Sequence, residues 1–231
     1  MGIKKYSLVF GMGLLAFLLI GCASAASPDV EVAEPAATQA QIIEKGSGIQ
    51  PLPTDSTGFY YYVNTERVQL TLSLKWIAVK FSSEDAAKQS SALDNSITTP
   101  LDQAYQIPPL KLTIIPLQEG QTIQSLVSGI NSLRENTEAF LQVNPVFETA
   151  DAEMTLTDEF IATFPPGATM DEINAINSSY GVEIAAPILG QENTFVLRAT
   201  AKALRDTLSL ANLYQESGAA LYSSPNFVRI K

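Results

Sequence analysis

The sequence has no histidine and only one cysteine, Cys22, among its 231 residues. Without histidine, the chain cannot form a Ser/His/Asp or Cys/His catalytic unit of its own. One thiol cannot build a Cys/His zinc cluster, and one cysteine cannot form a disulfide within the chain. We therefore expect no metal, no cofactor and no histidine-dependent catalysis.

Charged residues are also few. They make up 16% of the sequence, and 24 acidic residues outnumber 14 basic ones. A protein that binds nucleic acid neutralises phosphates with Lys and Arg, so this balance predicts that the chain does not bind nucleic acid. With 46% hydrophobic residues, the chain is large enough for one large domain or two small ones.

Residues 1–21 have the pattern of a secretion signal. Two lysines precede an apolar run, residues 8–20, that is too short to span a membrane. The run leads into Gly21-Cys22, which resembles the lipobox of bacterial lipoproteins. The resemblance implies that Cys22 carries a lipid anchor and holds the protein on the outer face of a bacterial membrane, in the cell envelope, with the outer membrane as one option in a Gram-negative cell. An ordinary signal peptide that contains a cysteine is the alternative.

Residues 22–57 have the composition of a flexible tether. They are rich in Ala, Ser, Pro and Glu, and none of them is aromatic. Such a segment cannot bury enough apolar surface to fold alone, so it would hold the folded part on the order of 30 Å from the membrane. The alternative is that part of it packs on the folded body as an irregular arm.

Residues 151–231 alternate between strand and helix patterns. Strands are predicted over residues 159–164, 182–188, 193–200 and 219–227, and helices over residues 169–180 and 201–216. Thr169 and Glu172 form a capping box, and Gly181 is a natural end for the helix that follows them. The order of elements predicts an α+β, ferredoxin-like split βαβ unit (βαββαβ), with both helices on one face of a four-stranded antiparallel sheet.

Residues 58–150 follow the same order less clearly, after an aromatic hairpin that turns at Asn64-Thr65-Glu66. Residues 93–110 give a poor signal for the second strand. The segments "WIAVKF" and "NPVF" of this unit match "FIATF" and "SPNF" of the next at equivalent places. We therefore predict two α+β units in tandem; chance similarity between two small units is the alternative.

Five motifs of the second unit occur in the order and spacing of a known family. They are Pro166-Gly167-Ala168, Tyr180-Gly181, the strand Thr194 to Arg198, the helix segment Leu208 to Tyr214, and Pro225-Asn226-Phe227. Through them, residues 155–230 resemble the propeptide domain of subtilisin-like serine proteases. The catalytic motifs that follow in that family are not among these 231 residues, and Ala220 and Ser223 replace two acids common in its last strand.

The resemblance implies a binding role. The open face of the sheet would dock on a subtilisin-like serine protease. The tail would then enter the active cleft as a strand beside the substrate-binding edge, where it would inhibit the enzyme, and the same contacts could template its folding. The tail residues are Phe227, Val228, Arg229, Ile230 and Lys231.

Two other functions remain open at this point. The chain could be a structural or interaction lipoprotein, or a relic of a truncated protease, that keeps the fold without binding a protease. It could also be an enzyme that uses carboxylates alone, with Asp158-Glu159 and Asp171-Glu172 as candidate pairs. The last two acids fall in the first turn of a predicted helix, where they complement its dipole, so we predict that the chain is not an enzyme.

Overall fold

The computed structural model describes residues 49–94 and 96–230. They belong to a single compact unit, Gln39–Lys231, defined by its internal contacts. The predicted signal peptide, Cys22 and most of the predicted tether lie outside the described residues, as does Lys231. Within the described ranges, none of the helices combines the length and hydropathy that crossing a membrane requires.

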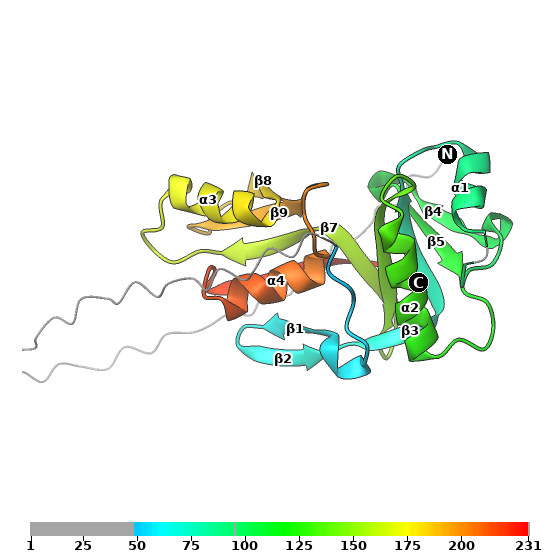
Figure 1. Ribbon diagram of the computed structural model, residues 1–231. Helices are drawn as coiled ribbons and strands as arrows, with labels where there is room; N and C mark the ends of the chain where they lie inside the picture. The colour runs from blue at the N-terminus through cyan, green and yellow to red at the C-terminus, as the bar shows by residue number, and fades with distance from the viewer. Residues whose placement is uncertain (1–48, 95, 231) are drawn as a thin grey trace, which may run out of the picture. The chain divides into compact units, whose positions relative to one another are not determined.

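The described residues form an α+β fold with antiparallel sheets, which confirms the predicted class (Figure 1). The first two strands, β1 (Tyr60–Val63) and β2 (Glu66–Gln69), form a separate hairpin. The larger sheet consists of β3 (Thr71–Phe81), β4 (Tyr105–Ile107), β5 (Leu112–Pro116), β6 (Phe140–Glu148), β7 (Glu153–Thr163), β8 (Val182–Pro187), β9 (Thr194–Ala199) and β10 (Tyr222–Arg229). The helices are α1 (Ala86–Ala92), α2 (Ile123–Glu135), α3 (Met170–Tyr180) and α4 (Thr207–Glu216).

The two halves of the larger sheet have the same internal order. The elements from β7 to β10 place their strands in the order β10-β7-β9-β8, and the elements from β3 to β6 place theirs in the order β6-β3-β5-β4. All of these pairs are antiparallel. The halves are joined where residues 146–148 of β6 pair with residues 153–155 of β7.

Two hydrophobic cores lie on one face of β7. Leu156 belongs to the core beneath α2, and Phe160 belongs to the core beneath α3 and α4. Because side chains alternate along a strand, residues four apart point to the same side. Helix α4 contributes to both cores, with Leu208 in the first and Tyr214 in the second.

The start and end of α3 are as predicted from the sequence. The side chain of Thr169 accepts a hydrogen bond from the backbone N–H of Glu172, and the Glu172 carboxylate accepts one from the backbone N–H of Thr169. Gly181 ends the helix with a φ of 70°, in the left-handed region that glycine adopts without a steric penalty. A Cβ at Gly181 would also lie 2.6 Å from backbone atoms of the β9–α4 loop.

The end of the predicted tether differs from expectation. Residues 49–57 pack on the folded body, because Leu52 is only 4% exposed and belongs to the first core. The backbone N–H of Gln50 donates to the carbonyl of Leu204 at 2.7 Å. This arrangement is the irregular arm that the sequence left open as an alternative.

Several element boundaries also differ. Strand β7 begins at Glu153, six residues earlier than predicted. Helix α4 begins at Thr207, six residues later than predicted, because the Asp206 side chain caps it at the N–H of Ser209. The poorly predicted segment before β5 contains a short strand, β4, at the edge of the sheet. A strand of three residues leaves too little periodicity to be recognised from sequence.

Candidate functional site

The predicted docking surface is the side of β7–β10 that faces away from α3 and α4, here called the outer face. Alternate residues of β7 separate the two sides: Phe160, Ala162 and Phe164 are buried under the helices, whereas the residues between them point outward. The strand registers extend this division across the sheet. The outer face therefore consists of Glu159, Ile161, Thr163, Glu183, Ala186, Thr194, Val196, Arg198, Tyr222 and Ser224.

The centre of the outer face is apolar and partly open. Ile161 and Val196 are cross-strand neighbours, and both are half-buried. On the opposite side of the same strands, Phe160 and Leu197 are fully buried at 0% exposure. Tyr222 borders the apolar centre and is 49% exposed. The outer face of the second half therefore keeps apolar side chains within reach of solvent.

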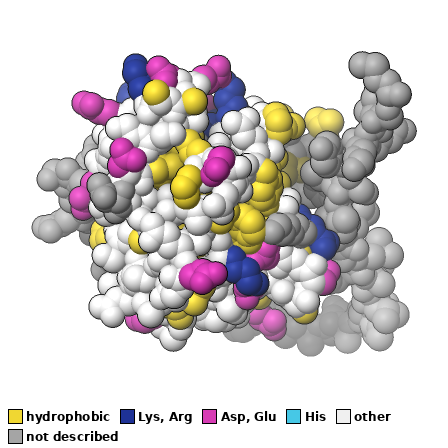
Figure 2. Space-filling view, turned by 90° about the vertical axis from the view of Figure 1, so that its right-hand side faces the viewer, with side chains coloured by type: hydrophobic (Ala, Val, Ile, Leu, Met, Phe, Trp, Pro, Cys, Tyr) yellow, Lys and Arg dark blue, Asp and Glu magenta, His cyan; other side chains and the backbone are white. Residues whose placement is uncertain are grey.

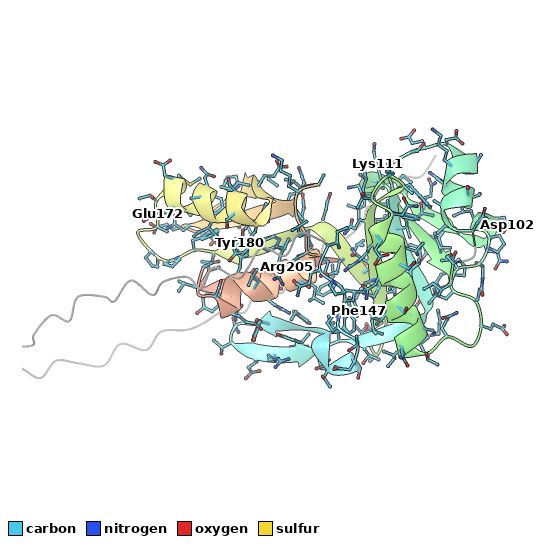
Figure 3. The ribbon with its side chains drawn as sticks, viewed as in Figure 1. Asp102, Lys111, Phe147, Glu172, Tyr180 and Arg205 are labelled. Atoms are coloured by element: carbon cyan, nitrogen blue, oxygen red, sulfur yellow. The ribbon has the colours of Figure 1, made fainter. Side chains whose placement is uncertain are left out.

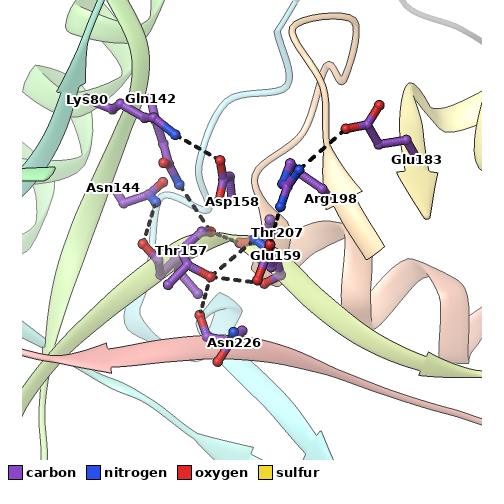
Figure 4. Close-up of polar contacts among 11 residues, drawn as sticks. Lys80, Gln142, Asn144, Thr157, Asp158, Glu159, Glu183, Arg198, Thr207 and Asn226 are labelled. Atoms are coloured by element: carbon purple, nitrogen blue, oxygen red, sulfur yellow. Dashed lines mark hydrogen bonds and ion pairs between the residues drawn. The ribbon is translucent and has the colours of Figure 1, made fainter. Parts of the chain in front are cut away.

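One end of the outer face carries a small ion network (Figure 4). The Arg198 guanidinium donates to the Glu159 carboxylate at 2.6 Å, and another of its nitrogens lies 3.7 Å from the Glu183 carboxylate. The hydrogen bond to Glu159 raises the pKa of Arg198 above its ordinary value. Because these groups are partly exposed, the network orients charge at the surface and contributes little to stability.

The outer side of the first half is closed by comparison. Ala78, Leu112, Ile114 and Val146 lie on β3, β5 and β6, outside both hydrophobic cores, yet each is at most 1% exposed. The Tyr105 ring packs edge-on against Trp76 at a centroid distance of 5.9 Å. The two halves therefore have the same strand order, but only the second half keeps apolar side chains of its outer side within reach of solvent.

Of the predicted tail residues, Phe227, Val228 and Arg229 belong to β10 and Ile230 follows it directly, while Lys231 lies outside the described residues. Residues 227–229 pair with residues 156–154 of β7. The Ile230 N–H donates to the carbonyl of Glu153 at 2.9 Å, and the Tyr105 hydroxyl donates to the carbonyl of Ile230 at 3.1 Å. The rings of Phe227 and Tyr61 pack edge-on, with their centroids 5.4 Å apart. In this conformation, residues 227–230 hold the two halves and the hairpin together.

Comparison of the chain with known protein families, with curated proteins and with solved structures found no match. The resemblance to protease propeptides and the lipobox on Cys22 therefore stay predictions.

The two candidate acid pairs are separated by the fold. Asp158 and Glu159 are neighbours on β7, but Asp158 pairs with Lys80 at 2.8 Å, while Glu159 pairs with Arg198. Asp171 and Glu172 lie in the first turn of α3, as predicted, at the other end of the second half (Figure 3). Hydrogen bonds from Thr169 lower the pKa of Glu172. Residues 49–94 and 96–230 contain no group of three His, Cys, Asp or Glu side chains that could hold a metal ion.

A polar network where β6 and β7 separate was not expected from the sequence (Figure 4). The Gln142 side chain donates to the carbonyl of Thr157 at 3.2 Å, and the Asn144 side chain donates to the carbonyl of Leu156 at 3.4 Å. From α2, the Arg134 guanidinium donates to the carbonyl of Val143 at 2.8 Å. One feature of the sequence could have indicated this network. Gln142 and Asn144 alternate with apolar residues along β6, which predicts that one side of the strand contacts polar groups.

The aromatic hairpin packs on the second half through its tyrosines. The hydroxyls of Tyr60 and Tyr62 both donate to the Glu216 carboxylate at the end of α4, at 2.6 and 3.0 Å. The Arg67 guanidinium lies over the Tyr60 ring, 3.5 Å from its centroid. Burial, together with the hydrogen bond to Glu216, raises the pKa of Tyr60 to about 12.

We therefore expect a loss of stability in alkali that depends on Tyr60. Its pKa is about 12 in the folded chain and 10.0 in an ordinary tyrosine, so neutral Tyr60 favours the folded state below pH 10. This contribution should disappear as the pH rises from about 10 to about 12. Tyr60→Phe cannot ionise, so its free energy of unfolding should fall less steeply across this interval. Denaturant unfolding at a series of pH values tests this, and equal slopes for both proteins would contradict it.

Proposed function

We propose that the described chain contains two ferredoxin-like units in tandem, and that the second is a propeptide-like unit. The equivalent strand orders β10-β7-β9-β8 and β6-β3-β5-β4 support this, because each corresponds to the order expected for a βαββαβ unit. The capping box at Thr169 and the left-handed Gly181 support it as well, since both belong to the segment that resembles the propeptide family.

We further propose that the protein is a non-catalytic, lipid-anchored binding module of the cell envelope. Its partner would be a subtilisin-like serine protease, which it inhibits or helps to fold. The observation that carries this proposal is the partly open apolar centre of the outer face at Ile161 and Val196. Exposed apolar surface with a polar rim is typical of sites that bind another protein. Here Arg198 and its two carboxylates provide such a rim.

The tail has a smaller part in this proposal than the sequence alone implies. Residues 227–230 are bonded to β7 and to Tyr105, so they would have to detach before entering a protease cleft. We therefore assign the docking to the outer face. The tail, Phe227 to Lys231, would fill the cleft only in a later step, which would break the pairing of this segment with β7.

A substitution at the centre of the outer face tests the proposal. Ile161→Arg puts a charge where an apolar contact is expected, so it should weaken inhibition of a responsive subtilisin-like protease by at least about tenfold, which is about 1.4 kcal/mol. The control is Leu74→Arg, which makes the same change at a 38% exposed leucine of β3. Inhibition constants for both variants should be measured against a panel of such proteases.

Two outcomes would reject this function. The first is that the unmodified chain neither inhibits any protease of the panel nor assists the refolding of one. The second is that Ile161→Arg and Leu74→Arg inhibit as well as the unmodified chain, which would exclude the outer face as the docking surface.

A structural or interaction lipoprotein is the second candidate. The observation that favours it is the polar share of the outer face, where Thr163, Ser224 and the Arg198 network surround a small apolar centre. Such a surface fits a weaker or more transient contact than the tight complex of an inhibitor. Failure of the protease panel, with the fold intact, would leave this candidate.

A further inference from the structure

An open cavity of about 530 Å³ lies where β6 and β7 separate. Its walls come from the end of α2, from β6 and from the loop between β9 and α4. Its volume falls within the range of about 300–1,000 Å³ that small-molecule sites occupy. The cavity shares no residue with the outer face defined above, so an inference from it does not depend on the proposed protease partner.

The charges around the cavity are arranged in pairs, with one cation left over. Lys80 pairs with Asp158 at 2.8 Å, and Arg134 pairs with Asp206 at 3.3 Å. Arg205 also lines the cavity and is half-buried. In the part of the chain that the structure describes, its guanidinium makes no hydrogen bond or ion pair.

Apolar side chains line the cavity beside these charges. Leu141 is 60% exposed and Ile49 is 37% exposed, while Phe140 is buried. Leu141 and Arg205 line the same cavity, so the cavity offers an apolar contact and an anion contact. Figure 2 shows hydrophobic side chains in a central band on the face at the right of Figure 1, and exposed apolar residues such as Leu189 and Leu221 lie outside the cavity lining, so exposure alone does not single out the cavity. The unpaired Arg205 is the feature that distinguishes the cavity from these other surfaces.

We propose that this cavity binds a small organic anion, in which one carboxylate or sulfonate group is joined to an apolar body. Arg205 binds the anionic group, because guanidinium forms strong, directional hydrogen bonds to such groups. Leu141 and Phe140 contact the apolar body. The ion pairs Lys80–Asp158 and Arg134–Asp206 keep the rest of the wall neutral, so a ligand with a single negative charge fits better than one with several.

Two fluorescent probes that differ in one charged group test this proposal on the full chain. The first, 8-anilinonaphthalene-1-sulfonate, has a sulfonate on an aromatic body; the second, N-phenyl-1-naphthylamine, has the same body without the charge. We expect the anionic probe to bind with the higher affinity. Arg205→Gln should weaken its binding by about tenfold or more, since a hydrogen bond to a charged group is lost, and should change binding of the neutral probe less than about twofold.

Two further variants complete the experiment. Lys202→Gln removes a cation from the same loop at an exposed position that does not line the cavity, so it should leave the binding of both probes unchanged. Ala201→Trp enlarges an exposed residue of the cavity wall and should weaken both probes. Circular dichroism verifies the fold of each variant, and Ala201→Trp decides the question if Arg205→Gln does not fold.

The proposal is overturned by any of three results. They are failure of the anionic probe to bind, equal loss of affinity in Arg205→Gln and Lys202→Gln, and unchanged binding of both probes to folded Ala201→Trp. Binding of the anionic probe that is sensitive only to the two cavity variants supports it.

Discussion

Replacing Arg134 with methionine should lower the free energy of unfolding by about 3–5 kcal/mol, the usual cost of breaking a buried ion pair from one side. The side chains of Arg134 and Asp206 are only 7% and 6% exposed. Their guanidinium and carboxylate lie 3.3 Å apart, and Arg134 also donates to Val143 and Asn144. The substitution keeps most of the apolar stem but leaves a buried carboxylate without its cation.

The position of Arg134 explains why the loss should affect the whole fold. Arg134 lies at the end of α2. Its N–H groups donate to β6 and to Asp206, the residue that caps α4, so this one side chain connects the three elements. These elements belong to different halves of the larger sheet, and the β6–β7 strand pairing that joins the halves covers only residues 146–148 and 153–155. A loosened junction should therefore lower the midpoint of a single unfolding transition or split it into two.

Arg198→Met is the matched control. Arg198 also pairs with carboxylates, but its side chain is 43% exposed, so the substitution should cost less than about 1 kcal/mol. Denaturant unfolding followed by circular dichroism measures both variants. Equal losses for the two arginines would contradict the role that we assign to burial at the junction.

The sequence predicted the second half of the fold well because its signals are local. Thr169 and Glu172 are three residues apart, and Gly181 follows the helix directly. Each end of the helix is therefore indicated by residues close to it in the sequence. Phe160, Ala162 and Phe164 likewise reveal the buried side of β7 by simple alternation. Such patterns do not depend on what the rest of the chain does.

The features that the sequence did not predict depend on contacts between distant residues. Arg134 and Asp206 are 72 positions apart, and Tyr105 and Ile230 are 125 apart, so neither pair leaves a periodic signal. The pairing of the tail with β7 was not predicted, because the last expected strand ended at Phe227 and the residues after it have no local reason to pair. Its pairing arises because β7 continues past β9 and presents residues 154–156 to β10.

The same reasoning separates the two candidate sites. The outer face could be located from sequence, since alternation identifies the side of each strand that faces away from the helices. The cavity could not, because its walls come from α2, β6 and the β9–α4 loop. Arg205 had no sequence signal as a binding residue, and only its lack of a partner in the described residues distinguishes it from other surface arginines.

Phe147→Ala should lower the free energy of unfolding by about 3–5 kcal/mol, the usual cost of truncating a fully buried phenylalanine. Phe147 is 0% exposed. Its ring lies 6.1 Å from that of Phe59 and 6.2 Å from that of Phe227, between centroids. One side chain of β6 thus contacts both the start of the hairpin segment and the end of β10, so its removal leaves a cavity among three parts of the fold.

The control for Phe147 lies on the same strand. Leu141→Ala removes a side chain that is 60% exposed, so it should change the free energy of unfolding by less than about 0.5 kcal/mol. Hydrogen exchange adds a second measurement, because Phe147→Ala should raise the exchange rate of the Ile230 N–H, which donates to Glu153 beside the lost contact. A variant that loses stability while this amide stays protected would show that β7 and Tyr105 hold the tail without help from the aromatic core.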